Sequence, residues 1–181
     1  EDRYVFVSGF HDGKATVLRL RKDGGVGEIV DGVFHKGLGS VAERNFRPHV
    51  NCVNITPDQK YLCAVDLGVH QVKIYKFNDE TGKITLVDML RCELESAPRI
   101  IKFSPDGRFA YLICELKNYI SVYTYKDGPR GPVFELVQTI STLNEYHSKG
   151  SAACVLRFSR DWNYVLCSNA GDNSVGIFKI D

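Results

Sequence analysis

The chain repeats one pattern of turn and strand at wide intervals, and this repetition constrains the fold more than any single motif does. The clearest copy runs from Ser159 to Ile180, S-R-D-W-N-Y-V-L-C-S-N-A-G-D-N-S-V-G-I-F-K-I. Related copies run from Thr56 to Phe77 and from Ser104 to Tyr125, and a fourth, shortened at its start, opens the chain. Self-similarity at a period of about 50 residues is typical of propellers and other repeat architectures.

The aspartate of the turn measures the spacing of the copies. Asp58 and Asp106 are 48 residues apart, and Asp106 and Asp161 are 55 apart. Placing Glu1 on Asp58 extends the series to the start of the chain, with an interval of 57 residues. We interpret the three aspartates as turn residues, since a short carboxylate side chain can bond the backbone two residues further on.

Alternation of apolar and polar residues predicts fourteen β-strands. They span 4–9, 15–21 and 27–34 in the first copy, 49–55, 61–66, 71–77 and 83–90 in the second, 98–103, 109–115, 119–125 and 133–140 in the third, and 152–158, 163–168 and 174–180 in the fourth. Residues 35–48 and 141–150 lack alternation and are expected to be connecting loops.

Four short antiparallel strands in each unit are the signature of a β-propeller blade. An all-β sandwich also has many short strands, but it would not return the same turn in register. We therefore predict an all-β propeller, with an incomplete blade at 1–40, blades at 41–92 and 93–146, and an incomplete blade at 147–181.

Fourteen strands make roughly three and a half blades, whereas closed propellers have about four to eight. The first copy lacks its innermost strand and the last lacks its outermost, so unpaired strand edges are left open. We expect the chain to be part of a longer polypeptide and to self-associate through these open blade edges. A light-scattering mass equal to one chain would count against self-association.

The charge balance excludes several classes of partner. The 23 basic and 22 acidic residues leave a net charge of +1, without the basic excess of a nucleic-acid binder. No run of 18 apolar residues is present to span a membrane, and the first residues lack the basic and apolar regions of a signal peptide. We expect a cytoplasmic protein that binds neither nucleic acid nor membrane.

The six cysteines are scattered and form no C-x-x-C pair. Cys63, Cys114 and Cys167 fall in the strand of each copy that should be most buried, so we interpret all six as reduced thiols. No His/Cys cluster has zinc spacing, and no phosphate-cradling glycine loop is present. We expect neither a metal nor a cofactor.

Three segments, in order and spacing, resemble the motifs of the lactonase family of seven-bladed propellers. Arg47–Val69 is similar to that family's P-H-x-H…P-D-G…D-L-G segment, and Ser96–Leu116 to its G-P-R-H…P-D-G…Y…E-L segment. Ser151–Val175 is similar to its A-E-I-H…S-P-D-G…S-N-R-G-x-D-S-I segment. The resemblance spans residues 1–181 and implies about half of such a propeller. It also implies hydrolysis of a small sugar lactone, such as 6-phosphogluconolactone, at the mouth of the central channel, without a metal.

The resemblance carries over to particular residues. His49 matches the first histidine of P-H-x-H, with Asn51 at the second, and Arg99 matches the arginine of P-R-H. His49 and Arg99 are the expected catalytic residues, with a water activated near His49. Asn51, and Asn169 in the S-N-R-G segment, are expected to contact the substrate.

The chain also departs from the family pattern. Ile100, Val155 and Ala170 stand where the motifs have a histidine, an acidic residue and an arginine. An apolar side chain can neither move a proton nor bind an anion. These departures favour an alternative, a non-catalytic propeller that binds a small anionic ligand or a protein partner.

One polar position recurs two residues before the turn, at Asn54, Lys102 and Arg157. Strand alternation places the three on one face, and we expect them to border the central channel at one height. Lys102 and Arg157, together with Arg99, could hold the phosphate or carboxylate of an anionic substrate. The same side chains could instead be solvated or pair with carboxylates of neighbouring blades.

The remaining polar positions are interpreted as structural. Asp66, Glu115 and Asn169 follow the second strand at what we take to be equivalent places, which predicts that they cap the next turn. The other histidines fall in turns or loops, where we expect them at the surface; they are His11, His35, His70 and His147.

Overall fold

The computed structural model describes residues 3–39 and 46–181. Its strands are β1 (Tyr4–Gly9), β2 (Lys14–Leu20), β3 (Val26–Phe34), β4 (Val50–Ile55), β5 (Tyr61–Asp66), β6 (Gln71–Phe77), β7 (Ile84–Arg91), β8 (Pro98–Phe103), β9 (Phe109–Cys114), β10 (Tyr119–Gly128), β11 (Gly131–Ser141), β12 (Ala152–Phe158), β13 (Tyr164–Ala170) and β14 (Ser174–Lys179). All fourteen predicted strands are present, and the described residues contain no helix. Nothing in these two ranges is therefore a helix able to cross a membrane.

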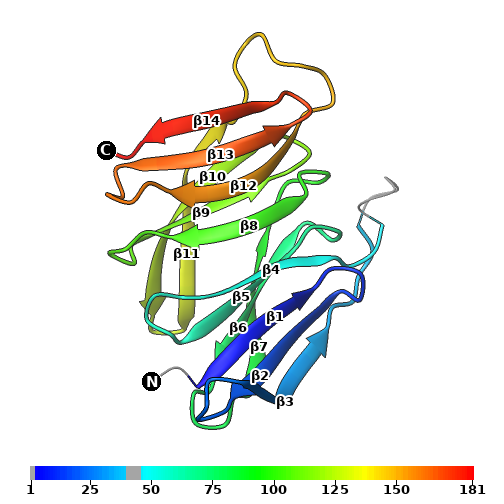
Figure 1. The fold of residues 1–181 in the computed structure, drawn as a ribbon, viewed down its shortest axis with the longest axis vertical. Coiled ribbons are helices and arrows are strands. Elements are labelled where there is room, and N and C mark those ends of the chain that lie inside the picture. The colour runs from blue at the N-terminus through cyan, green and yellow to red at the C-terminus, as the bar shows by residue number, and fades with distance from the viewer. Residues whose placement is uncertain (1–2, 40–45) are drawn as a thin grey trace.

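The strands form four antiparallel sheets that follow one another along the long axis of the molecule (Figure 1). Their orders are β1-β2-β3, β4-β5-β6-β7, β8-β9-β10-β11 and β12-β13-β14. This arrangement confirms the all-β fold and the succession of blades. The predicted boundary between residues 40 and 41 and the placement of Glu1 on Asp58 lie outside the described residues.

The strands β4, β8 and β12, here called the innermost strands, each end in the same turn. In the second sheet Thr56 Oγ1 donates to Asp58 Oδ1 at 2.6 Å, and the Tyr61 amide donates back to Thr56 Oγ1 at 3.0 Å. The same two bonds recur through Ser104, Asp106 and Phe109 and through Ser159, Asp161 and Tyr164. The three aspartates are confirmed as turn residues.

Apolar side chains pack between successive sheets and hold them together. All six residues of β5 are buried, because a sheet covers each face of that blade. In β13 buried and more open residues alternate, since only the face toward the third sheet is packed. On the other face Val175 and Ile177 are 62% and 64% exposed. Self-association is predicted through the open blade edges, and the mass measurement remains its test.

All six cysteines are free. Cys63, Cys114 and Cys167 are buried, as expected from their strands. Burial raises the pKa of the Cys114 thiol to about 11 and also raises that of Cys167. These thiols therefore stay protonated at neutral pH and pack as small apolar side chains.

Candidate active site

Each innermost strand carries a β-bulge near its start. In β4 the register shifts between Val50 and Cys52, and β8 and β12 shift at the corresponding step. The extra residues are Asn51 in β4, Arg99 in β8 and Cys154 in β12. A bulge takes one residue out of the ladder and re-aims its side chain, and bulges are common beside active sites. The register thus makes Asn51 and Arg99 equivalent, a relation the motif comparison did not reveal.

Arg99 is held by a buried carboxylate. Its Nη1 donates to Oε2 of Glu115, and the two side chains are 31% and 4% exposed. From the neighbouring sheet Asn51 Nδ2 donates to the Arg99 carbonyl oxygen at 3.0 Å. The guanidinium is therefore fixed in orientation while part of it remains open to a ligand, which is the arrangement needed to receive negative charge.

The sequence indicated that Glu115 and Asp66 occupy equivalent places, but the strand register shows that they do not. Asp66 pairs with Val50, the residue before the bulge, and in the third sheet it is Cys114 that pairs with Pro98. Glu115 comes one residue later, and neighbouring strand residues point to opposite faces. Its carboxylate consequently meets Arg99. Counting from the turn serine rather than from the E-L motif would have found this shift.

His49 stacks on a ring from the first sheet. Its imidazole lies 4.4 Å from the Phe10 ring, at an interplanar angle of 17°, and Nδ1 lies 3.0 Å from the Phe10 carbonyl oxygen. A carbonyl oxygen only accepts hydrogen bonds, so Nδ1 carries the proton and the neutral ring keeps its lone pair on Nε2. Nε2 is thus the nitrogen able to take up a proton.

Asp66 organises the backbone around His49. This fully buried carboxylate accepts bonds from the amides of His49 at 2.8 Å and Gly68 at 3.1 Å, and lies 2.6 Å from Nδ1 of His35. The Val69 amide also donates to it, which confirms the predicted turn cap for this residue. Burial alone would raise the pKa of Asp66, but the bonds from His35, His49 and Val69 outweigh it, and the pKa is lowered.

His35 and His70 are buried, contrary to the expectation that they lie at the surface. They are 6% and 4% exposed. His35 is drawn in by Asp66, 31 residues away in the chain, and burial lowers the pKa of His70. A contact of that separation cannot be read from local alternation. His11 and His147 are exposed, as expected.

Asn169 is buried in β13 and donates hydrogen bonds to the segments beside it. Its Nδ2 donates to the Thr142 carbonyl oxygen at 2.9 Å and to Ser174 Oγ at 3.1 Å. These bonds tie the connection between the third and fourth sheets to the last hairpin. Its substrate contact remains a prediction.

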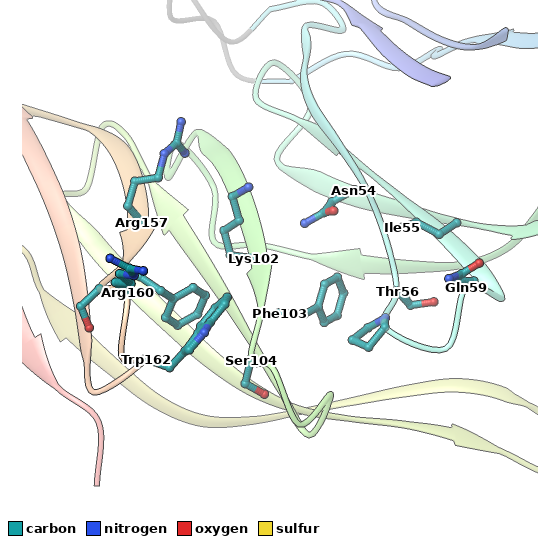
Figure 2. Close-up of a pocket in the computed structure, with 13 residues that line it drawn as sticks. Asn54, Ile55, Thr56, Gln59, Lys102, Phe103, Ser104, Arg157, Arg160 and Trp162 are labelled. Carbon is teal, nitrogen blue, oxygen red and sulfur yellow. The ribbon is translucent and has the colours of Figure 1, made fainter. Parts of the chain in front are cut away.

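Asn54, Lys102 and Arg157 lie toward the opposite ends of the innermost strands. There they line a common cavity of about 650 Å³ (Figure 2), in agreement with their predicted equal height. Asn54 Nδ2 donates to the Ile101 carbonyl oxygen at 3.1 Å and so links β4 to β8. Arg99 is outside the lining of this cavity and pairs with Glu115 instead.

Gly68 leaves no room for a side chain beside His49. An added Cβ would lie 1.7 Å from the Arg47 carbonyl oxygen and 3.1 Å from His49 Cδ2. We expect Gly68→Ala to displace residues 46–49 and to lower the free energy of unfolding by about 3 kcal/mol, measured in urea. Gly9→Ala is the control, because the added Cβ would lie an ordinary 3.5 Å from its nearest neighbour, the Lys14 carbonyl oxygen. Equal stability of the two variants would contradict the close approach.

These features define a class of protein: a β-propeller with polar side chains placed by bulges on its innermost strands. The family model described as lactonase, seven-bladed β-propeller, matches residues 1–181. The chain therefore belongs to the lactonase family of seven-bladed β-propellers.

Relatives and solved structures agree with this assignment. The chain is 28% identical to the 6-phosphogluconolactonase of Bacillus subtilis over 181 residues, which is 100% of this chain and 50% of that protein. It superposes on a Lactobacillus plantarum protein with a TM-score of 0.89 and 28% identity, covering 99% of this chain and 51% of the other. For the periplasmic gluconolactonase of Pseudomonas aeruginosa the TM-score is 0.87 and the identity is 29%, and the match covers 99% of this chain and 50% of the other. The chain spans about half the length of the curated relatives it matches, which confirms the expected half propeller.

Proposed function

We propose that the protein hydrolyses a small sugar lactone, such as 6-phosphogluconolactone, where the innermost strands begin. The observation that carries this proposal is Arg99, placed by a bulge, oriented by Glu115 and partly open. Family membership supports lactone chemistry, since relatives bear the names 6-phosphogluconolactonase and gluconolactonase.

The proposed reaction needs one base and one oxyanion donor. Water adds to the lactone carbonyl carbon while Nε2 of His49 takes its proton, and Arg99 donates to the oxyanion that forms. Collapse of this intermediate breaks the ring C–O bond, and the proton passes from His49 to the departing ring oxygen. The product is the open hydroxy acid, with no other reactant consumed.

Asn51 and Asn169 are the proposed polar contacts to the substrate at this end. Asn51 bonds the Arg99 backbone through its amide nitrogen, so it would offer its carbonyl oxygen to a sugar hydroxyl. Lys102 and Arg157, expected to hold an anionic group, line the cavity at the other end of the strands. The free cysteines support a reducing compartment such as the cytoplasm, whereas one similar protein is named periplasmic.

The hydrolysis itself is the first test. We expect the chain to open 6-phosphogluconolactone faster than the spontaneous rate, followed by acid release at constant pH. His49→Gln should remove most of that acceleration, and Lys149→Met, an exposed position on a loop, should keep it. A wild-type rate equal to the spontaneous one would refute the lactonase proposal.

A non-catalytic binding propeller is the second candidate. Ile100, at the position of a motif histidine, packs against the core between the third and fourth sheets. That side chain cannot take part in proton transfer. Saturable binding of the lactone without turnover would favour this candidate.

A further inference from the structure

The cavity at the turn end of the innermost strands gathers positive charge. Lys102 from β8, Arg157 from β12 and Arg160 from the following turn all line it. No ion pair found among residues 3–39 and 46–181 involves any of the three. Lys102 and Arg157 extend to the same side in Figure 2. The cavity therefore favours an anionic occupant.

The position of Lys102 remains open even where a further sheet covers its blade. Lys102 pairs with Tyr111 across β8 and β9, so it shares the face of the third sheet that packs on the fourth. It still lines the cavity. Arg157 holds the same place in the fourth sheet, two residues before the turn serine. A following sheet should leave it equally accessible.

Trp162 adds an aromatic surface at a conformational cost. It is the only tryptophan in the sequence, and it adopts a φ of 61° at a turn position where the second sheet has Gln59 at 59° and the third has Gly107 at 72°. Bulky residues avoid this left-handed region, which the repeated turn imposes at the same position in all three sheets. Trp162 is 47% exposed and lines the cavity, with its ring 4.9 Å from that of Phe158. A flat ring could stack on its open face.

We propose that this cavity binds a phosphate ester that carries a flat ring, of which a nucleoside monophosphate is the simplest example. The phosphate lies between Lys102 and Arg157, and the ring stacks on Trp162. A volume of about 650 Å³ suits a ligand of this size. His49 and Arg99 do not line the cavity, so this site is separate from the proposed lactone site.

Trp162 itself reports on binding. The full chain is titrated with adenosine 5′-monophosphate, with adenosine and with inorganic phosphate, and the tryptophan fluorescence is followed. We expect saturable quenching by the monophosphate, with adenosine and phosphate each binding at least about tenfold more weakly. No saturable binding of the monophosphate at millimolar concentration would overturn the proposal. Phosphate binding as tightly as the monophosphate would overturn it too, because the ring would then contribute nothing.

Variants locate the site. Lys102→Met and Arg157→Met should each weaken binding of adenosine 5′-monophosphate by about tenfold or more, and Lys149→Met should leave it unchanged. Trp162→Gly, followed by calorimetry, should also bind more weakly, and Gly107 shows that glycine suits this turn position. Thermal melting confirms that each variant is folded. Unchanged affinity in folded Lys102→Met and Arg157→Met would overturn the proposal.

Discussion

Methionine in place of Arg99 is expected to lower kcat for lactone hydrolysis about 100-fold or more. The variant loses the donor to the developing oxyanion, and removal of one such donor typically has an effect of this order. The kcat of Arg99→Lys should lie between those of the wild type and Arg99→Met, since an ammonium keeps the charge but not the planar fork of donors. The measurement is kcat for 6-phosphogluconolactone after subtraction of the spontaneous rate.

A double variant separates catalysis from stability. Arg99→Met removes the positive charge beside the buried Glu115 carboxylate and should also destabilise the fold. Adding Glu115→Gln removes the buried negative charge, so Arg99→Met/Glu115→Gln should regain stability in urea while its kcat stays low. If activity returned together with stability, Arg99 would have a structural role only.

Alanine in place of Asp66 is expected to lower the free energy of unfolding by about 3–5 kcal/mol. The variant leaves the backbone amides of His49 and Gly68 without their acceptor and removes the partner of His35. Asp66→Asn should cost less than half as much, because its amide oxygen can still accept the backbone bonds. Urea unfolding measures both. An alanine variant as stable as the wild type would show that this network does not stabilise the loop.

Acid should remove part of the stability that Asp66 contributes to the folded protein. Its pKa is lowered in the folded protein, so the stabilisation is complete above the unfolded-state pKa of about 4 and is lost as the pH falls through the folded value. Asp66→Asn lacks this titration. The difference in free energy of unfolding between wild type and Asp66→Asn should therefore become smaller below about pH 4. A difference that grew would contradict a lowered pKa of Asp66 in the folded protein.

The repeat could be read from the sequence because its causes are local. Asp58, Asp106 and Asp161 bond side chains and amides only two residues away in the chain. Turns of this kind keep their composition wherever they occur. Strand alternation is equally local, and together the two features indicated the number and order of the strands.

The candidate site could be predicted only in part. The motifs pointed to His49 and Arg99, but not to the Glu115 carboxylate that orients Arg99 or to the Phe10 ring that packs on His49. These partners come from other strands or other sheets. Asp66 was recognised as a turn cap, while its bond to His35 was missed because it joins residues 31 apart.

The sequence by itself determined a propeller of repeated blades, its turn chemistry and the cysteines packed in its core. Only the tertiary structure decided which polar side chains meet. Each innermost strand gains one residue at a bulge, and a shift of one residue turns a strand side chain to the opposite face. Strand pairing within the third sheet therefore brought Glu115 to Arg99, while Lys102 and Arg157 line a separate cavity at the other end.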